Sequence, residues 1–267
     1  LRSKIKGRSF DGVIHFAAKS IVPESVINPL LYYRNNVVGT FNLIEVLLEN
    51  DINNIVFSST AAIFGNPCKR KISEDHPKKP INPYGTSKLM VENFLEDIWE
   101  NKKMNSTSLR YFNAAGAHES GEIGECHDPE THLIPVILKS IIDSNISLKV
   151  FGDDYQTHDG TCIRDYIHVY DLCNAHILSL ENMINNEGCF FYNLGNGNGF
   201  SVKEVIKSCE KVTKRDIAYE VIEKRSGDPD RLVSNSNLAF NELNWKPKYT
   251  DLDEIISSAW NWHNKQS

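Results

Sequence analysis

Short apolar runs alternate with longer helical stretches through the first half of the chain, and this alternation constrains the fold most. Strands are predicted at residues 12–18, 55–59 and 108–112. Between them, residues 35–48 and 87–99 carry apolar side chains at the spacing of a helix with one buried face. Strand–helix–strand units with crossovers of this length pair their strands in parallel. The sequence therefore predicts an α/β fold with a doubly wound parallel sheet.

The pattern changes after Asn113 and predicts a second, smaller α/β region. A polar loop at residues 116–131 leads to a predicted helix at 134–143 and a predicted strand at 148–151. We expect this region to lie over the carboxyl edge of the first sheet. Further helices are predicted at residues 169–182, 201–213, 236–243 and 252–263, and further strands near residues 190–194 and 218–222.

Composition argues against several classes of protein. The formal net charge of −6 leaves no basic excess for binding a nucleic-acid backbone. No apolar run approaches the roughly 20 residues that span a bilayer, so we expect neither a nucleic acid nor a membrane as a partner. The six cysteines are scattered without a C-x-x-C pair, which predicts reduced thiols in a cytoplasmic protein and no metal site.

Tyr84 and Lys88 give the sharpest local signal. Four positions apart on a helix, the two side chains share one face. A lysine ammonium beside a phenol favours the phenolate, and a phenol that acts as a base near pH 7 needs its pKa lowered by about 3 units from about 10. Taken alone, the same spacing also fits an ordinary pair on an exposed helix face.

Thr60 gives a second signal that changes the weight of the first. It follows the predicted strand at residues 55–59, and open α/β sheets bind their ligands at the carboxyl ends of strands. Its hydroxyl can bridge a substrate oxygen and the Tyr84 phenol. A turn that merely ends a strand is the alternative. The two signals in this order, each on the expected element, predict an active site.

Segments along the whole chain resemble the extended short-chain dehydrogenases that act on nucleotide sugars. The first of these segments are HFAA (15–18), NNVVGT (35–40), SST (58–60), NPYGTSK (82–88) and RYFN (110–113). Within that family, later segments resemble the UDP-galactose 4-epimerases. They lie at residues 116–118, 132–135, 151–155, 159–161, 164–169, 192–195, 201–202 and 227–229.

The resemblance implies NAD as the cofactor, a UDP-sugar as the substrate, a homodimer, and a mechanism. Tyr84 takes the proton of the sugar's 4-hydroxyl with Thr60 between them, hydride passes from C4 to NAD, and the 4-keto sugar turns to receive it on its other face. Lys88, with the positive nicotinamide ring, keeps Tyr84 acidic. The residues assigned to the cofactor are Phe16, Ala17, Ala18, Lys19, Ser20, Asn35, Thr60, Tyr84, Lys88 and Phe112.

The resemblance also implies a site for the UDP part of the substrate. Arginine forks match phosphate oxygens and a carboxylate can hold ribose hydroxyls, although each such residue alone also fits an exposed salt bridge. Leu232, expected beside the sugar's C2 substituent, is apolar and intermediate in size, which favours UDP-galactose and UDP-glucose over N-acetyl sugars. His132 stands where many relatives carry asparagine. The implied substrate-binding residues are Thr60, Tyr84, Asn113, His132, Leu133, Lys149, Phe151, Arg164, Arg225, Asp228 and Leu232.

Two alternatives to an epimerase stay open. One is a related nucleotide-sugar dehydratase or decarboxylase. In the dehydratases an acidic residue follows the strand-end threonine, whereas here Ala61 and Ala62 follow Thr60 and neither exchanges a proton. The other is a truncated, non-catalytic protein that binds nucleotide sugars. Because the chain begins at Leu1, after the first strand, glycine-rich turn and helix of the family pattern, we expect that segment to be absent and the chain as given to hold little NAD.

The resemblance divides the chain into two domains. We expect an NAD-binding domain, incomplete at its amino end, at residues 1–113 with a return segment at about 166–195. A nucleotide-sugar-binding domain is expected at residues 114–165 and 196–267.

The glycine-rich loop at residues 195–199 imitates a dinucleotide fingerprint. It follows a predicted strand and precedes a predicted helix, as such a fingerprint would. However, Phe200 takes the place of the third glycine, and the family has this loop in its substrate domain. We therefore interpret it as a loop shaped by its glycines.

Overall fold

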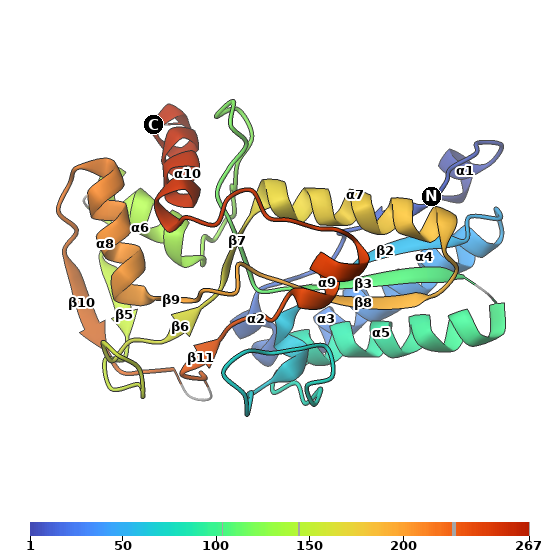
Figure 1. The fold of residues 1–267 in the computed structure, drawn as a ribbon, viewed down its shortest axis with the longest axis horizontal. Coiled ribbons are helices and arrows are strands. Elements are labelled where there is room, and N and C mark those ends of the chain that lie inside the picture. The colour runs from blue at the N-terminus through green and yellow to red at the C-terminus, as the bar shows by residue number, and fades with distance from the viewer. Residues whose placement is uncertain (103, 144, 226–227, 267) are drawn as a thin grey trace.

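A four-stranded parallel sheet forms the larger part of the molecule (Figure 1). The computed structural model describes residues 1–102, 104–143, 145–225 and 228–266. The strands are β1 (Val13–His15), β2 (Asn54–Ser58), β3 (Asn105–Tyr111) and β8 (Cys189–Leu194), in the order β1-β2-β3-β8, and every pair is parallel. The predicted α/β fold with a parallel sheet is confirmed.

Helices cover both faces of this sheet because side chains along each strand alternate between the faces. On β2, Ile55 and Phe57 pack in a buried cluster with α4 (Gly39–Leu48) and α5 (Pro83–Lys102). Val56, between them, packs in a different cluster with α7 (Val169–Asn185). Figure 1 shows α7 on one side of the strands and α5 on the other.

Helix α5 begins earlier than the predicted helix that starts at residue 87. Pro83 fits a first helical turn because its missing N–H needs no partner there, and the Asn82 side chain accepts a backbone N–H of that turn at 2.9 Å. The predicted helix at 35–48 is a π-helix, η1 (Tyr33–Val38), continued by α4. The shorter helical segments are α1 (Arg2–Ile5), α2 (Val22–Ile27), α3 (Pro29–Tyr32) and the 3₁₀ turn η2 (Ala61–Phe64).

A second region of small sheets and helices adjoins the carboxyl ends of β3 and β8 (Figure 1). Its helices α6, α8 and α10 pack around one apolar cluster that includes Ile137, Val205 and Ile255. The helices are α6 (Leu133–Ile142), α8 (Val202–Thr213) and α10 (Leu252–Gln266). The paired strands are β4 (Asn113–Ala115) with β7 (Tyr166–His168), β5 (Leu148–Phe151) with β10 (Tyr219–Ile222), and β6 (Ile163–Arg164) with β9 (Phe200–Ser201) and β11 (Arg231–Leu232).

Helix α9 (Asn237–Glu242) packs on the larger region, in the cluster that contains α7 and β8, although the predicted division placed its residues in the second domain. Ala239 and the buried Trp245 join the cluster that contains α7 and β8. The Trp245 indole N–H donates to the Asp171 carbonyl at 2.8 Å. A buried indole needs such an acceptor, and α7 supplies it.

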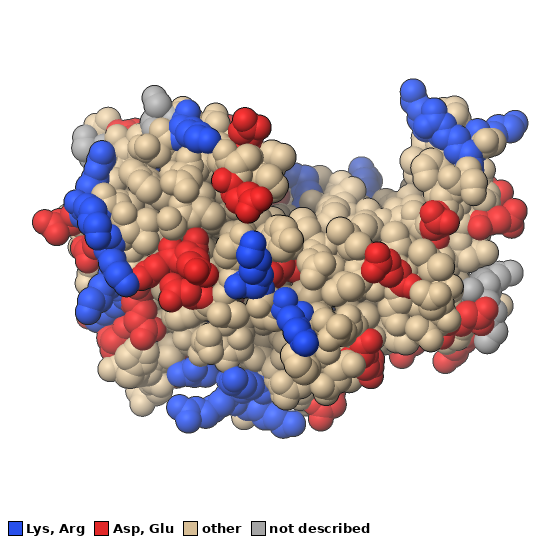
Figure 2. All heavy atoms as spheres, turned by 45° about the horizontal axis from the view of Figure 1, so that its top comes forward, with Lys and Arg blue, Asp and Glu red and all other residues tan. Residues whose placement is uncertain are grey.

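The surface and the cysteines agree with an ordinary globular protein. The face drawn in Figure 2 carries acidic and basic side chains side by side, with α1 projecting from the body. All six cysteines are free thiols. None of the helices that the structure describes combines the length and the apolar character needed to cross a bilayer.

Candidate active site

The side chains predicted to carry the chemistry converge where β2 ends and α5 begins. Thr60 is buried just beyond β2, and its Oγ1 accepts the Ala62 N–H at 3.1 Å. Tyr84 and Lys88 stand one turn apart on α5, with the Lys88 Nζ 6.0 Å from the centre of the Tyr84 ring. A side-chain hydrogen bond joins Thr60 to Tyr84. The fold thus brings together the three residues that the sequence singled out.

Lys88 occupies an enclosed position, with a relative exposure of 3%. Its Nζ donates to the Ser58 carbonyl at 2.7 Å and lies 4.8 Å from the centre of the Phe57 ring. Burial lowers the pKa of Lys88 to about 7, while the negative charge of Glu92 acts in the opposite direction. In the protein alone, this amine therefore titrates near neutral pH.

We expect Lys88→Met to stabilise the fold at about pH 6. The ordinary pKa of lysine is 10.5 and that of folded Lys88 is about 7. Between these values the unfolded chain holds a proton that the folded chain lacks, so the parent's free energy of unfolding rises with pH. Below this window the cost of the buried charge is fully present, and its removal is expected to add about 1–4 kcal/mol. Urea unfolding across the window measures the gain, which should shrink toward pH ~10. A loss of stability at pH ~6 would contradict this.

The Tyr84 phenol is not acidic in the protein alone. Burial raises its pKa above the ordinary value, the neighbouring Tyr111 raises it further, and the Thr60 hydrogen bond lowers it. The Tyr32 ring stands edge-on to it at 6.5 Å between centres. The expected lowering of this pKa by Lys88 is therefore not seen in the protein alone. The positive nicotinamide ring, the other charge invoked from the resemblance, remains to supply it.

Asn36 fixes the predicted cofactor loop to α5, and sequence reasoning missed it. Its Oδ1 accepts the Lys19 N–H at 2.8 Å, and its Nδ2 donates to the Lys19 carbonyl at 3.0 Å and to the Ser87 Oγ at 3.1 Å. The adjacent Asn35 donates to the same Oδ1 at 3.0 Å. Its place beside Asn35, in a segment already recognised, was the signal that could have found it.

The loop that Asn36 holds presents apolar surface at the carboxyl end of β1. Phe16 is 54% exposed, and its ring lies 4.6 Å from that of His176. Ala17 is also exposed, whereas Ala18 and Lys19 are half-buried. Such a ledge beside Lys88 suits the flat face of a cofactor ring. Ser20 is exposed at its end.

A buried ion pair lies directly behind the site and was also missed. Arg110 on β3 donates to Glu92 on α5 through Nε at 3.0 Å and Nη2 at 2.8 Å. Ser59, next to Thr60, donates to the same carboxylate at 2.6 Å. The side chains of Arg110 and Glu92 are 1% and 0% exposed. This pair joins β2, β3 and α5 at the point where Thr60 leaves the sheet.

The residues predicted to hold the nucleotide gather on the second region, largely paired with one another. Arg164 on β6 forms an ion pair with Asp228. The Tyr155 hydroxyl donates to the other oxygen of Asp228 at 3.4 Å. The Arg225 guanidinium lies 3.8 Å from the centre of the Phe151 ring. Two cations and a carboxylate are thus assembled from segments far apart in the sequence.

The structure places the remaining predicted substrate residues in different surroundings. The Asn113 amide donates to the Asp165 carbonyl at 2.9 Å, and Leu133 packs on the core of the second region. Leu232, like the predicted cofactor residue Phe112, packs against the buried cluster that contains Ile63 and Phe64. Lys149 is exposed on β5, and the His132 Nδ1 contacts the Glu125 carboxylate, whose hydrogen bond raises the pKa of this imidazole.

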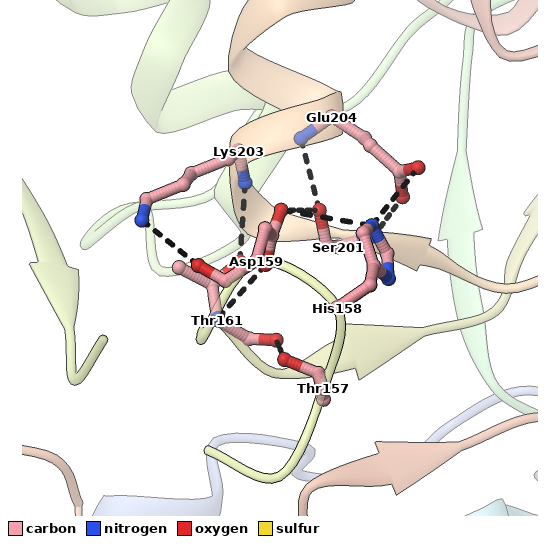
Figure 3. Close-up of polar contacts among 7 residues, drawn as sticks. All are labelled: Thr157, His158, Asp159, Thr161, Ser201, Lys203 and Glu204. Carbon is pink, nitrogen blue, oxygen red and sulfur yellow. Dashed lines mark hydrogen bonds and ion pairs between the residues drawn. The ribbon is translucent and has the colours of Figure 1, made fainter. Parts of the chain in front are cut away.

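The Asp159–Thr161 segment, part of the family resemblance, has a structural role (Figure 3). Asp159 accepts the Thr161 hydroxyl at 2.8 Å and the Ser201 hydroxyl at 2.5 Å. Ser201 in turn caps α8, with Glu204 completing a capping box. Gly160 has φ +81°, and an added Cβ there would lie 2.0 Å from a backbone oxygen. This network fixes the chain just before β6, which carries Arg164.

The glycine-rich loop at residues 195–199 serves an internal carboxylate rather than a phosphate. The Asn196 and Gly197 N–H groups donate to Asp165 at 2.7 and 2.9 Å, and the Ser234 N–H donates to it at 2.9 Å. Burial raises the pKa of Asp165 to about 6 against these three hydrogen bonds. The interpretation of this loop as one shaped by its glycines agrees with these contacts.

A cleft of about 550 Å³ opens beside the predicted nucleotide residues. It is lined by residues 67–70, 156–158 and 229–231. None of the predicted catalytic or binding residues lines it, although Asp228 and Leu232 flank one of its segments. The chemistry is therefore located by the side chains at the sheet edge and not by this cleft.

Comparisons with known proteins place the chain in a family. A family model described as GDP-mannose 4,6 dehydratase matches residues 1–259. The UDP-glucose 4-epimerase of Halalkalibacterium halodurans is 51% identical over 96% of this chain and 76% of its own length. A solved UDP-glucose 4-epimerase superimposes with a TM-score of 0.96 at 46% identity, over 99% of this chain and 80% of that one. The Bifidobacterium longum UDP-glucose 4-epimerase, solved with NAD⁺ and UDP, gives 0.93 at 40%, over 99% and 79%.

The parallel sheet with a tyrosine and a lysine one turn apart at its carboxyl edge defines an extended short-chain dehydrogenase/reductase. The sequence resemblance to this class is thereby confirmed. Within the class, this chain belongs to the UDP-glucose 4-epimerase family.

Proposed function

We propose that the protein interconverts UDP-galactose and UDP-glucose by transient oxidation of the sugar at C4, with NAD as its cofactor. One observation carries the proposal: Thr60, Tyr84 and Lys88 converge at the carboxyl edge of the sheet. The second region adds Arg164, Arg225 and Asp228. Relatives named UDP-glucose 4-epimerase, one of them solved with NAD⁺ and UDP, support the proposal.

The described residues fit the nicotinamide end of NAD. The apolar ledge at Phe16 and Ala17 is accessible, and Asn36 holds its backbone at a fixed distance from α5. Lys88 presents an amine from the floor of the same edge. When bound, NAD supplies a reversible acceptor for the hydride of C4.

The protein's own residues move and hold the proton. Tyr84 accepts the proton of the sugar's 4-hydroxyl and later returns it. Thr60, hydrogen-bonded to Tyr84, bridges the 4-hydroxyl and the phenol. Because burial raises the pKa of Tyr84, the phenolate requires a nearby positive charge. Acid–base groups of this kind contribute about 10²–10⁴ to rate.

The charged residues of the second region suit a fixed handle for the substrate. Arg164 and Arg225 can each grip phosphate oxygens with a planar fork. In the protein alone, Asp228 neutralises Arg164 and Phe151 lies under Arg225. Binding of a diphosphate to these preplaced cations would hold UDP while the keto sugar turns.

A product assay tests this function and separates it from the dehydratase alternative. Incubated with UDP-galactose and NAD, a protein that contains this chain together with the family's amino-terminal segment is expected to form UDP-glucose without added reductant. Because Ala61 and Ala62 follow Thr60, no dehydrated keto sugar is expected. A dehydrated main product would overturn the proposal.

We expect UDP-N-acetylgalactosamine to react less well, by about 10–200-fold in kcat/KM, since Leu232 offers no hydrogen bond to an acetamido group.

The homodimer, the cytoplasmic location and the two-domain division are also proposals. Val38 in η1 and Met90 on α5 are 49% and 45% exposed, and the Phe41 and Phe94 rings between these helices lie 4.1 Å apart. Apolar side chains exposed on neighbouring helices support a contact between copies. Sedimentation of the protein and of Met90→Lys tests the dimer, which a monomeric parent would contradict.

A further inference from the structure

Four side chains of types that bind metal ions converge on the loop before α6. They are Glu125, His127, Glu130 and His132, and their ligand atoms all lie within 4.8 Å of one another. The scattered cysteines predicted no metal site. The spacing E-x-H-x-x-E-x-H at residues 125–132 is the signal in the sequence that points to one.

The distances within this cluster resemble those between the ligands of one small cation. The Nδ1 atoms of His127 and His132 both face the Glu125 Oε1, the first at 2.9 Å. The Glu130 Oε1 lies 3.9 Å from the His127 Nδ1. Ligands of tetrahedral zinc, bound at about 2.0–2.2 Å, stand about 3.3–3.5 Å apart. The observed separations fall on both sides of that value.

The Glu130 carboxylate supplies a second, independent indication. Its side chain is 6% exposed, and its Oε2 is buried with no hydrogen-bond partner among the described residues. The Lys139 Nζ forms an ion pair with this oxygen at 3.7 Å, without a hydrogen bond. Oε1 accepts the N–H groups of Thr131 and His132 at 2.8 and 3.0 Å. Metal-bound carboxylates are typically oriented by contacts of this kind, and here they hold Oε1 on the side of the His127 imidazole.

We propose that Glu125, His127, Glu130 and His132 bind one Zn²⁺ ion. Two imidazole nitrogens with carboxylate oxygens suit zinc, whereas Mg²⁺ and Ca²⁺ prefer oxygen ligands throughout. Both imidazoles are 52% exposed on their side chains, so the ion can enter from solvent.

The site would fasten a loop that has no regular secondary structure of its own. Residues 116–132 form neither helix nor strand, and the Trp262 indole donates to the Glu125 carbonyl at 3.0 Å. The loop ends at His132, the residue directly before α6. Zinc there would fix the start of α6, a segment predicted to contact the substrate, so its removal is expected to affect KM more than kcat.

Metal analysis of the purified protein tests the proposal without any substrate. After dialysis against zinc and washing, we expect one zinc per chain, and Co²⁺ in its place should give the visible absorption of a tetrahedral site. His127→Ala and Glu125→Gln should lose the metal. His118→Ala, a histidine of the same loop outside the cluster, is the matched control and should keep it.

Thermal unfolding supplies a second readout. Since a ligand of the folded state raises the melting temperature with its concentration, zinc should raise that of the parent and of His118→Ala but not that of His127→Ala. A parent that binds no zinc, or a His127→Ala/Glu125→Gln double variant that binds as much as the parent, would overturn the site. Equal loss from His118→Ala would do the same. None of these results depends on the epimerase activity.

Discussion

Tyr84→Phe is expected to lower kcat by ~10²–10⁴ while UDP-sugar binding is nearly unchanged. The substitution removes the phenolic oxygen that accepts the 4-hydroxyl proton and keeps the ring that packs edge-on to Tyr32. The pH profile should change as well. In the parent, the rate rises with pH as the phenol ionises, and this rise should vanish in the variant because its side chain cannot titrate.

Steady-state kinetics with UDP-galactose, together with equilibrium binding of UDP, measures this prediction. Tyr170→Phe is a suitable control because Tyr170 is 50% exposed on α7. Tyr170→Phe also removes a phenolic oxygen, but it leaves the surroundings of Thr60 and Lys88 unchanged. Parental kcat in Tyr84→Phe would show that another group accepts the proton.

Glu92→Gln is expected to destabilise the fold by about 3–5 kcal/mol, since it leaves the Arg110 guanidinium buried without its counter-charge. The substitution should also disturb the position of Thr60 in the active site. Ser59 donates to the same carboxylate and directly precedes Thr60. Denaturant unfolding at constant pH measures the free energy.

Two controls separate the cost of an unpaired charge from the value of the pair. Asp154→Asn breaks an exposed pair with Lys224, whose side chains are 64% and 48% exposed, and should cost less than about 1 kcal/mol. Replacing Glu92 and Arg110 together by leucine and methionine should cost less than Glu92→Gln. A Glu92→Gln variant as stable as Asp154→Asn would contradict the assigned role.

Local patterns carried much of the fold and the centre of the site. The run Ile55–Phe57 is apolar at consecutive positions because a strand of a doubly covered sheet is buried on both faces, and this pattern is visible without coordinates. Tyr84 and Lys88 were found because a helix turns through one full turn between them. Thr60 was found because a strand end in a parallel sheet faces the ligand side.

Tertiary structure alone decided which polar groups meet. Glu92 and Arg110 are 18 residues apart, and Arg164 and Asp228 are 64 apart, so no periodicity links them. The first pairing depends on the packing of α5 against β3, and the second on the register of β6 against β11. Tertiary structure also decided the position of α9, because its six residues give too short a pattern to show that it packs against α7 and β8.

The sequence by itself determined the parallel sheet, the Tyr84–Lys88 helix and the family, because each depends on residues close together in the chain or on motifs in a fixed order. Only the tertiary structure decided the electrostatic state of the site. Burial shifts the pKa of Lys88 down and that of Tyr84 up, and burial follows from packing of elements that are distant in sequence. For the same reason, the burial of the Glu130 side chain and the distances to its neighbours became visible only in three dimensions.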